Sequence, residues 1–338
     1  MDGRWHDGSR ARSSNDGSVV DEVVATASSP RCVVIAGPTG AGKSALALDL
    51  AERFGGEIVN ADSRQIYRYM DIGTAKPTAQ ERARVPHHVL DVADPDERFD
   101  AARYRELASA AVAGIAGRGR VPLIVGGSGL YLRALTRGLF AAPAAMPRLR
   151  RALEALEGRR AGTLHRWCAR LDPDVAARVH SHDHVRLVRA LEVLLATGET
   201  ISVQQRRHGF ADPVVARLYL VVDPGVESLK QRIESRTRAL FERGLIEEVR
   251  ALWQRGYGPQ LAAMRSIGYL EAGRVLAAER SREEAVADVM RATLRFAKRQ
   301  RTWFRAERDV RWVHPDSDRR RIAEEIAAFL DVPRPAAL

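Results

Sequence analysis

Short apolar runs alternate with longer amphipathic segments from residue 31 onward. A run of about four to eight apolar residues is typical of a strand buried in a parallel sheet, and apolar residues that recur every three or four positions are typical of a helix. The alternation predicts an α/β fold in which a parallel sheet is flanked by helices. The predicted strands are residues 32–36, 57–60, 88–92, 121–125 and 217–222, and the predicted helices between them include residues 44–53, 101–116 and 129–137.

Residues 147–200 interrupt this alternation. They carry Leu, Ala and Arg at helical spacing and contain no strand-like run, so we expect an inserted helical module. A second helical stretch, residues 228–306, follows the last predicted strand and is densely basic near its end. We therefore divide the chain into an α/β core with C-terminal helices, residues 30–146 and 201–338, and the insertion at 147–200.

The first 29 residues have a different composition from the rest. They are rich in Ser, Gly, Asp and Arg and contain no apolar stretch before a small-residue cleavage site, so they do not form a signal peptide. We interpret them as a disordered extension. A wrongly assigned start codon is an equally ordinary explanation.

Several classes of protein are disfavoured by composition. No apolar run approaches the roughly 18 residues that a membrane-spanning helix needs, so the sequence predicts a soluble protein. Cys32 and Cys168 are far apart and have no Cys or His at metal-ligand spacing, which argues against a disulfide framework or a zinc site. His87 and His88 would point to opposite faces of a strand, with no third ligand nearby. We expect a cytoplasmic monomer.

The net charge is +11, with a pI near 10.3, and the excess of basic residues is mostly arginine. Arginine suits contacts with phosphates and bases, although a general composition bias would give the same balance. The placement of the charges is more informative. Within residues 290–308, Arg291, Arg295, Lys298 and Arg305 share one helical face. Such a face is either a solvated surface or a phosphate-binding one.

The first predicted strand is followed by a phosphate-binding motif. The pattern G-x-x-x-x-G-K-[ST] places glycines where backbone N–H groups can turn toward an anion, at the start of a helix whose dipole favours negative charge. Lysine adds a positive charge, and the final hydroxyl can ligate Mg²⁺. Kinases, NTPases and enzymes with a diphosphate leaving group all remain compatible with this motif. Its residues are Gly37, Pro38, Thr39, Gly40, Ala41, Gly42, Lys43 and Ser44.

A polar, irregular segment, residues 60–77, follows the second predicted strand. The carboxyl ends of parallel strands share one crevice, so Asp62 should lie near the phosphates that Lys43 holds. A carboxylate at this place can be a magnesium ligand, a turn-forming cap or a general base. Local sequence favours the first two roles over the third.

These segments resemble the tRNA dimethylallyltransferase (tRNA isopentenyltransferase) family. The resemblance rests on residues 62–67 and 70–77, and it continues through residues 86–91, 126–131, 186–192, 232–236 and 297–300. It covers nearly everything from about residue 31 to 315. The family usually has Thr where this chain has Ser128, and it differs at Leu270 and at residues 293–297.

The resemblance implies a reaction and a set of site residues. The family transfers the dimethylallyl group of dimethylallyl diphosphate to N6 of the adenine 3′ of the anticodon, position 37, with Mg²⁺. Asp62 would act as the general base, supported by Lys43 and Ser128. The diphosphate would lie on residues 37–44 and Arg236, with the metal on Ser44. The implied tRNA contacts are Asp62, Ser63, Arg64, Gln65, Arg150, Arg186, Arg189, Arg265, Lys298, Arg299, Gln300 and Arg305.

Three other functions are weighed against this one. A related enzyme that prenylates free adenine nucleotides is disfavoured by the helical insertion and the basic C-terminal helix. A small-molecule kinase of the P-loop class would share the phosphate motif but not the remaining segments. A non-catalytic RNA-binding protein is disfavoured by the intact Lys43, Ser44 and Asp62.

Overall fold

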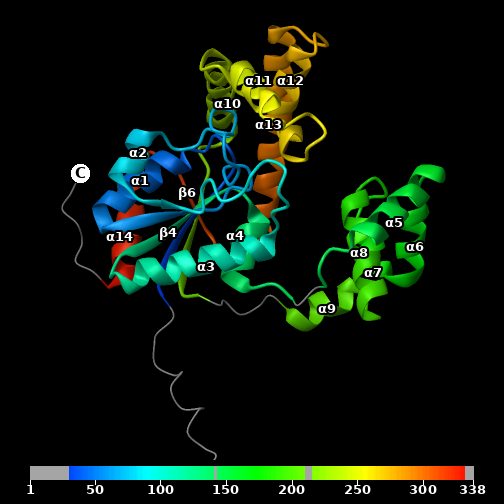
Figure 1. Cartoon of the computed structure of the whole chain (residues 1–338). Helices are drawn as coiled ribbons and strands as arrows, with labels where there is room; N and C mark the ends of the chain where they lie inside the picture. The colour runs from blue at the N-terminus through cyan, green and yellow to red at the C-terminus, as the bar shows by residue number, and fades with distance from the viewer. Residues whose placement is uncertain (1–29, 141–142, 210–214, 332–338) are drawn as a thin grey trace, which may run out of the picture.

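The computed structural model describes residues 30–140, 143–209 and 215–331, so the predicted extension at residues 1–29 lies outside the described residues (Figure 1). A six-stranded parallel sheet forms the centre, in the order β3-β2-β4-β1-β5-β6. This arrangement confirms the predicted fold class. The strands are β1 Cys32–Ala36, β2 Gly56–Asn60, β3 His87–His88, β4 Val121–Gly126, β5 Arg217–Val222 and β6 Arg311–Val313.

Strand β1 lies at the middle of the sheet and is buried on both faces. Val33 is in register with Leu123 of β4 on one side and with Leu218 of β5 on the other. Alternate residues of β1 enter two different cores: Val33 and Ile35 pack in one, and Cys32, Val34 and Ala36 pack in the other. The continuous apolar run seen in the sequence is therefore the signature of a strand covered on both sides.

Helices cover both faces of the sheet. Helices α1 Lys43–Phe54, α10 Val226–Glu242 and α14 Arg319–Leu330 pack on the face of Val33, and α3 Ala101–Gly117 and α4 Gly129–Arg137 pack on the other. Three further helices pack in the core that contains Val34: α11 Leu245–Gln254, α12 Tyr269–Leu276 and α13 Arg282–Arg305. Figure 1 shows α13 running from the α11–α12 pair down to the sheet. A short helix, α2 Ala79–Arg84, precedes β3, and a 3-10 turn, η1 Ala263–Arg265, precedes α12.

The predicted third strand is wrong beyond its first residue. Only His87–His88 pairs with β2, and the backbone then turns at Val89 (φ 60°) and Asp91 (φ 56°), a left-handed conformation that a strand cannot contain. The carboxylate of Asp91 accepts hydrogen bonds from Lys76 (2.5 Å) and Arg82 (2.8 Å), which hold it in the turn. Polar contacts with side chains from the preceding loop and helix α2 thus override the apolar pattern at 88–92.

Strand β6 and helix α14 were missed by the sequence pattern. Strand β6 is only three residues long, and two of them, Arg311 and Trp312, are exposed at the sheet edge. Its pairing with β5, in which Val221 faces Trp312, is a long-range contact. A strand of this length has too few residues to produce a period in the sequence.

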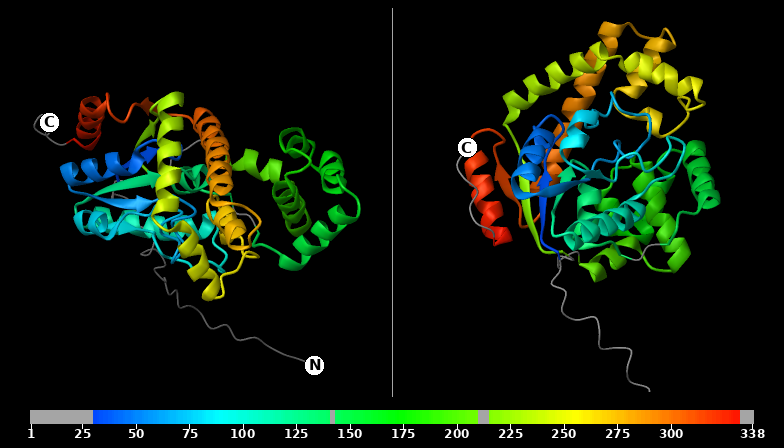
Figure 2. Two further views of the ribbon diagram at one scale, coloured as in Figure 1. Left: turned by 90° about the horizontal axis from the view of Figure 1, so that it is seen from above. Right: turned by 60° about the vertical axis from the view of Figure 1, so that its left-hand side comes forward.

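The helical module forms a cluster beside the sheet, joined to it by two connections (Figure 2, left). It has its own core, which includes Leu153, Leu164, Leu187 and Leu191. The module extends past the predicted boundary at residue 200, because Ile201 packs in this core and the Ser202 amide donates to Asp172. Its helices are α5 Pro147–Arg159, α6 Thr163–Leu171, α7 Pro173–Arg178, α8 His184–Thr197 and α9 Ile201–His208. Within the described residues, no helix is long and apolar enough to cross a membrane.

Candidate active site

The P-loop, residues 37–44, connects the end of β1 to the start of α1. Gly37 has φ 142°, and a Cβ built there would lie 2.3 Å from the carbonyl oxygen of Val222, so this position requires glycine. Gly42, with φ 91°, immediately precedes the first residue of α1, Lys43. The loop therefore presents backbone N–H groups at a helix N-terminus, where an anion is favoured.

Lys43 is perturbed by burial in the site. Its Nζ donates to the carbonyl oxygen of Pro38 at 2.7 Å, within the P-loop itself. Burial lowers the pKa of Lys43 to about 8; the charge of Arg236 acts in the same direction, and that of Asp62 opposes it. Burial also lowers the pKa of Arg236. Two partly desolvated cations beside one carboxylate form a site suited to an anion with more than one negative charge.

One cavity collects the phosphate-site residues and the polar segment. It is lined by Lys43, Ser44 and Thr39 of the P-loop, and by Asp62 and Arg236. The structure thus brings together side chains that lie almost 200 residues apart in the sequence, as expected for strand ends that share one edge of a parallel sheet.

Hydrogen bonds with residues close in sequence hold Asp62 in place. Its backbone N–H donates to Oδ1 of Asn60 at 3.1 Å, and one of its own carboxylate oxygens accepts from the Arg64 N–H at 2.8 Å. Asn60, which is buried, also donates to the carbonyl oxygen of Val89 at 3.0 Å. Asp62 lines the cavity, and its carboxylate has acceptor sites beyond the one that the Arg64 N–H uses.

Ser128 connects the second glycine loop to the Asp62 segment. A Cβ at Gly126 would lie 2.1 Å from the carbonyl oxygen of Ala61, so two backbones meet in direct contact here. The Ser128 N–H donates to that same oxygen at 3.1 Å, and its Oγ accepts from the Ser63 N–H at 2.9 Å. The hydroxyl therefore fixes the start of the polar segment and keeps its own proton to donate.

Sequence reasoning missed Glu248, which organises the far end of the polar segment. Its carboxylate accepts from three consecutive backbone N–H groups, those of Asp71, Ile72 and Gly73, at 2.7–3.1 Å. It also accepts from the Tyr269 hydroxyl at 2.6 Å. Glu248 is one of two adjacent acidic residues on the amphipathic helix α11, and nothing in the local pattern distinguishes it from Glu247.

Lys76 was also missed, although it lies inside a quoted motif. It is buried, and its Nζ donates to the carbonyl oxygen of Tyr67 and to the carboxylates of Asp71 and Asp91. Gln65 donates from Nε2 to the carbonyl oxygens of Thr74 and Ala75, so the two ends of residues 65–75 are hydrogen-bonded to each other. The available signal was a lysine beside a proline in an irregular segment that is rich in polar residues.

The residues predicted to contact tRNA fall into two groups. In the α/β part, Arg64, Arg265, Lys298, Arg299 and Arg305 are exposed, whereas the side chain of Gln300 lies buried between the P-loop and the second glycine loop. In the helical module, Arg186 is exposed next to Asp183. The tRNA contacts of both groups stay predictions.

Arg150 and Arg189 have a structural partner within the helical module. Both donate to Glu192, whose side chain is fully buried. Burial by itself would raise the pKa of Glu192, but hydrogen bonds from Arg150, the Met146 amide and Arg189 lower it to about 2. The two guanidinium groups remain about one-third accessible, so they stabilise the module and still reach solvent.

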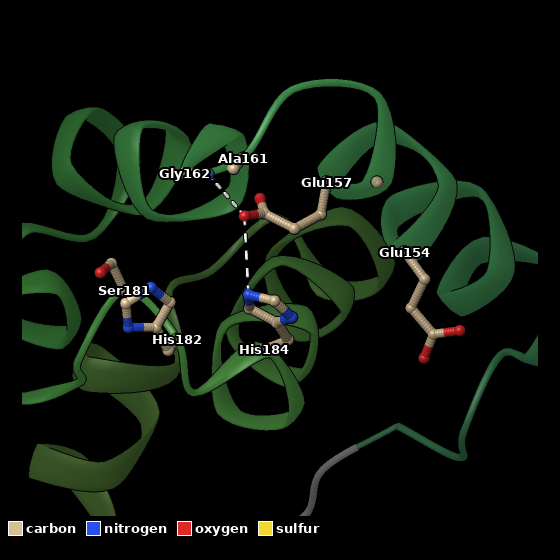
Figure 3. Close-up of a pocket in the computed structure, with 8 residues that line it drawn as sticks. Glu154, Glu157, Ala161, Gly162, Ser181, His182 and His184 are labelled. Atoms are coloured by element: carbon tan, nitrogen blue, oxygen red, sulfur yellow. Dashed lines mark hydrogen bonds and ion pairs between the residues drawn. The ribbon is translucent and has the colours of Figure 1, made fainter.

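A second hollow lies wholly within the helical module (Figure 3). Glu157 stands at its centre, accepts from the Leu164 and Gly162 amides, and lies 3.6 Å from Nε2 of His184. The amides keep the pKa of Glu157 below its usual value. Among the described residues no group of three or more His, Cys, Asp or Glu side chains could hold a metal ion. Glu157 closes the turn between α5 and α6, and this role accounts for its position.

Comparison with known proteins identifies what the chain resembles. The family model described as IPP transferase matches residues 65–307. The tRNA dimethylallyltransferase of Geobacter metallireducens is 51% identical over 284 residues, which are 84% of this chain and 92% of that protein. The tRNA dimethylallyltransferase of Myxococcus xanthus is 50% identical over 290 residues, which are 85% of this chain and 93% of that protein.

Two solved structures have the same fold. The tRNA isopentenylpyrophosphate transferase of Bacillus halodurans has a TM-score of 0.67 at 35% identity, covering 89% of this chain and 97% of that one. A eukaryotic dimethylallyltransferase acting on tRNA has a TM-score of 0.72 at 28% identity, covering 90% of this chain and 81% of that one. The resemblance extends over the α/β part and the helical module together.

Replacing Glu248 by alanine should destabilise the protein by about 3 kcal/mol, because three backbone N–H groups and a buried hydroxyl lose a charged acceptor. The free energy of unfolding is measured by chemical denaturation. Glu247→Ala is the matched control, since Glu247 is an exposed neighbour on the same helix. Equal stability of the two variants would show that the polar segment does not depend on Glu248.

Proposed function

The chain belongs to the IPP transferase family, and we propose that it transfers the dimethylallyl group of dimethylallyl diphosphate to N6 of the adenine 3′ of the anticodon, position 37, in tRNA. The product would be N6-isopentenyladenosine. The observation that carries this proposal is the single cavity shared by Lys43, Arg236 and Asp62. It combines a diphosphate cradle with a carboxylate, as a displacement of diphosphate by an amine requires.

The reaction forms one bond and breaks one. The adenine N6 bonds to C1 of the dimethylallyl group, and the bond from C1 to the diphosphate oxygen breaks. The electron pair of that bond leaves with the diphosphate, whose growing charge is stabilised by the P-loop amides, Lys43 and Arg236. The proton of N6 passes to the carboxylate of Asp62, which acts as the general base.

Ser128 and the P-loop residues have supporting roles. Because the Ser128 hydroxyl accepts from the Ser63 amide, it holds the residue next to Asp62 and can donate to the incoming base. The buried floor of the cavity, formed by residues such as Ile58 and Ala47, excludes water from the allylic carbon. We propose residues 37–44 and Arg236 as the groups that bind the diphosphate.

The oxygen-rich site is compatible with Mg²⁺. This ion prefers oxygen ligands and usually keeps several waters while binding substrate phosphates through only one or two protein groups. Ser44 lies exposed at the start of α1 on the cavity wall, where its hydroxyl would supply one such ligand. When bound, the ion would neutralise charge on the diphosphate oxygens.

The tRNA substrate explains the remaining parts of the molecule. A base inside a stacked loop cannot reach a cavity at the edge of a sheet, so the target adenine must be turned out of its stack. Exposed arginines on α13 and on the helical module would hold the flanking phosphates. We propose that the protein acts as a monomer, and a tRNA substrate supports action in the cytoplasm.

Mass spectrometry of nucleosides tests the function directly. Purified protein is incubated with tRNA, dimethylallyl diphosphate and Mg²⁺, and the tRNA is then digested. The expected product is prenylated adenosine, absent when dimethylallyl diphosphate is omitted. Prenylation of free adenine nucleotides alone would favour the nucleotide enzyme, and phosphate transfer without prenylation would favour a kinase.

Asp62→Asn keeps the shape of the side chain and removes its basicity. We expect kcat to fall by about 10²- to 10⁴-fold, with little change in tRNA affinity, since general bases typically contribute that much and RNA binding is spread over many contacts. The measurement is single-turnover prenylation at saturating substrates and several Mg²⁺ concentrations. Asp96→Asn, an exposed carboxylate outside the cavity, is the control. Full rescue by excess Mg²⁺ would make Asp62 a metal ligand instead.

Binding of dimethylallyl diphosphate should weaken as the pH rises. Because the pKa of Lys43 is lowered to about 8, the side chain is charged below that value and neutral above it. If the cation binds the diphosphate, affinity should fall by about tenfold for each pH unit above about pH 8. Lys43→Arg stays charged over this range and should bind with a flatter profile. Calorimetry without tRNA from pH 7 to 10 measures both; identical profiles would exclude Lys43 as the titrating group.

A further inference from the structure

Helix α13 has two opposite faces with different surroundings. Its inner face is buried against the rest of the protein and contains Ala297, Gln300 and Phe304. The outer face is exposed and carries Arg291, Arg295, Lys298 and Arg305. A single rigid helix therefore has a cationic surface on one side and the catalytic cavity wall on the other, because Gln300 lines that cavity.

Gln300 bridges the two loops that form the cavity. Its side-chain oxygen accepts from the Thr39 N–H of the P-loop at 2.9 Å, and its Nε2 donates to the Gly127 carbonyl oxygen at 2.9 Å. The residue is only 7% exposed. One partner needs an acceptor and the other needs a donor, so a carboxamide satisfies both, whereas a carboxylate or an ammonium group satisfies only one.

Two side chains of α13 pack directly against the glycines of the second loop. A Cβ at Gly127 would lie 2.3 Å from Nε2 of Gln300, and a Cβ at Gly129 would lie 2.1 Å from Nε1 of Trp303. Two positions of α13, three residues apart, are thus seated directly on the backbone of the second glycine loop. The residue between those glycines, Ser128, in turn holds the Ser63 amide next to Asp62.

A continuous set of contacts therefore runs from the outer face of α13 to both halves of the reaction site. In one direction it reaches the P-loop through Thr39, and in the other it reaches Asp62 through Gly127 and Ser128. Both ends of the Gln300 carboxamide are engaged inside the protein, and this geometry favours a role that acts through the helix.

We propose that Gln300 is a positioning residue that makes the binding of tRNA and the binding of the diphosphate depend on one another. RNA phosphates held on the outer face of α13 fix the helix, and Gln300 then fixes the P-loop and the second glycine loop in the arrangement that receives the diphosphate. The coupling is reciprocal, so a bound diphosphate also strengthens tRNA binding. The proposal rests on the proposed function, because it takes α13 to be a tRNA-binding surface.

The test measures the dissociation constant of inorganic diphosphate, with Mg²⁺, in the absence and presence of saturating tRNA. The tRNA is one that the unaltered protein prenylates in the nucleoside assay, so failure of the proposed function is detected separately and first. We expect tRNA to tighten diphosphate binding by about fivefold or more in the unaltered protein, within the usual range of coupling between sites. A ratio of one in a protein that prenylates tRNA would overturn the proposal.

Two substitutions separate positioning from simple packing. Gln300→Ala removes the side chain, and Gln300→Met keeps its length and volume but makes neither hydrogen bond. Both should reduce the coupling ratio to about one. Gln204→Ala is the control, because Gln204 is a similarly buried glutamine that donates to Thr197 within the helical module. A normal ratio in Gln300→Met would show that Gln300 only fills space.

Gln300→Glu provides a readout that is independent of folding losses. The ionised carboxylate can still accept from Thr39 but cannot donate to the Gly127 oxygen, so coupling should be lost at neutral pH. The protonated acid has both a donor and an acceptor, so it can replace both hydrogen bonds of the carboxamide. The coupling ratio should therefore recover as the pH is lowered, relative to the unaltered protein at the same pH. A ratio that does not change with pH would contradict the positioning role.

Discussion

The site depends on how closely the backbone of one strand end can approach the next. Gly37 brings the P-loop against the end of β5, and Gly126 brings the end of β4 against Ala61, which follows β2. A single added methyl group would separate these segments, because in each case it would overlap a carbonyl oxygen. The cavity exists because four parallel strands end at one edge with backbones in contact, and the charged side chains that follow them then share one small space.

Placing Lys43 and Arg236 in that space removes part of their hydration, which is electrostatically unfavourable. Lys43 loses part of its hydration, which is why its pKa is lowered, and Pro38 supplies the only close acceptor described for its ammonium group. A diphosphate would replace the lost hydration and stabilise Lys43 together with Arg236. Because these cations are poorly hydrated, they attract the diphosphate strongly and also stabilise the negative charge that grows on it as it leaves. Substrate binding and catalysis therefore use the same electrostatic interaction.

Polar networks hold the irregular segments where a strand or helix cannot. Glu248 binds three backbone N–H groups of residues 71–73, and Lys76 binds the Tyr67 carbonyl oxygen and two carboxylates. Glu192 accepts from Arg150 and Arg189 in the helical module. Each of these groups is buried or half-buried and fully hydrogen-bonded, which is the condition under which a buried charge is tolerated. Function therefore also depends on residues whose polar groups are occupied by partners within the protein.

The sequence by itself determined the parallel sheet, the phosphate loop and the family. These features are local: an apolar run, a glycine pattern before an amphipathic helix, and long motifs all remain within a few tens of residues. Tertiary structure alone decided the turn at Val89, the pairing of β6, the task of Glu248 and the inward orientation of Gln300. Gln300 lies in a basic helix whose pattern indicates an RNA surface, but its two partners are 261 and 173 residues away. A hydrogen bond across such a separation is specified by the packing of the whole fold, so no local pattern can reveal it.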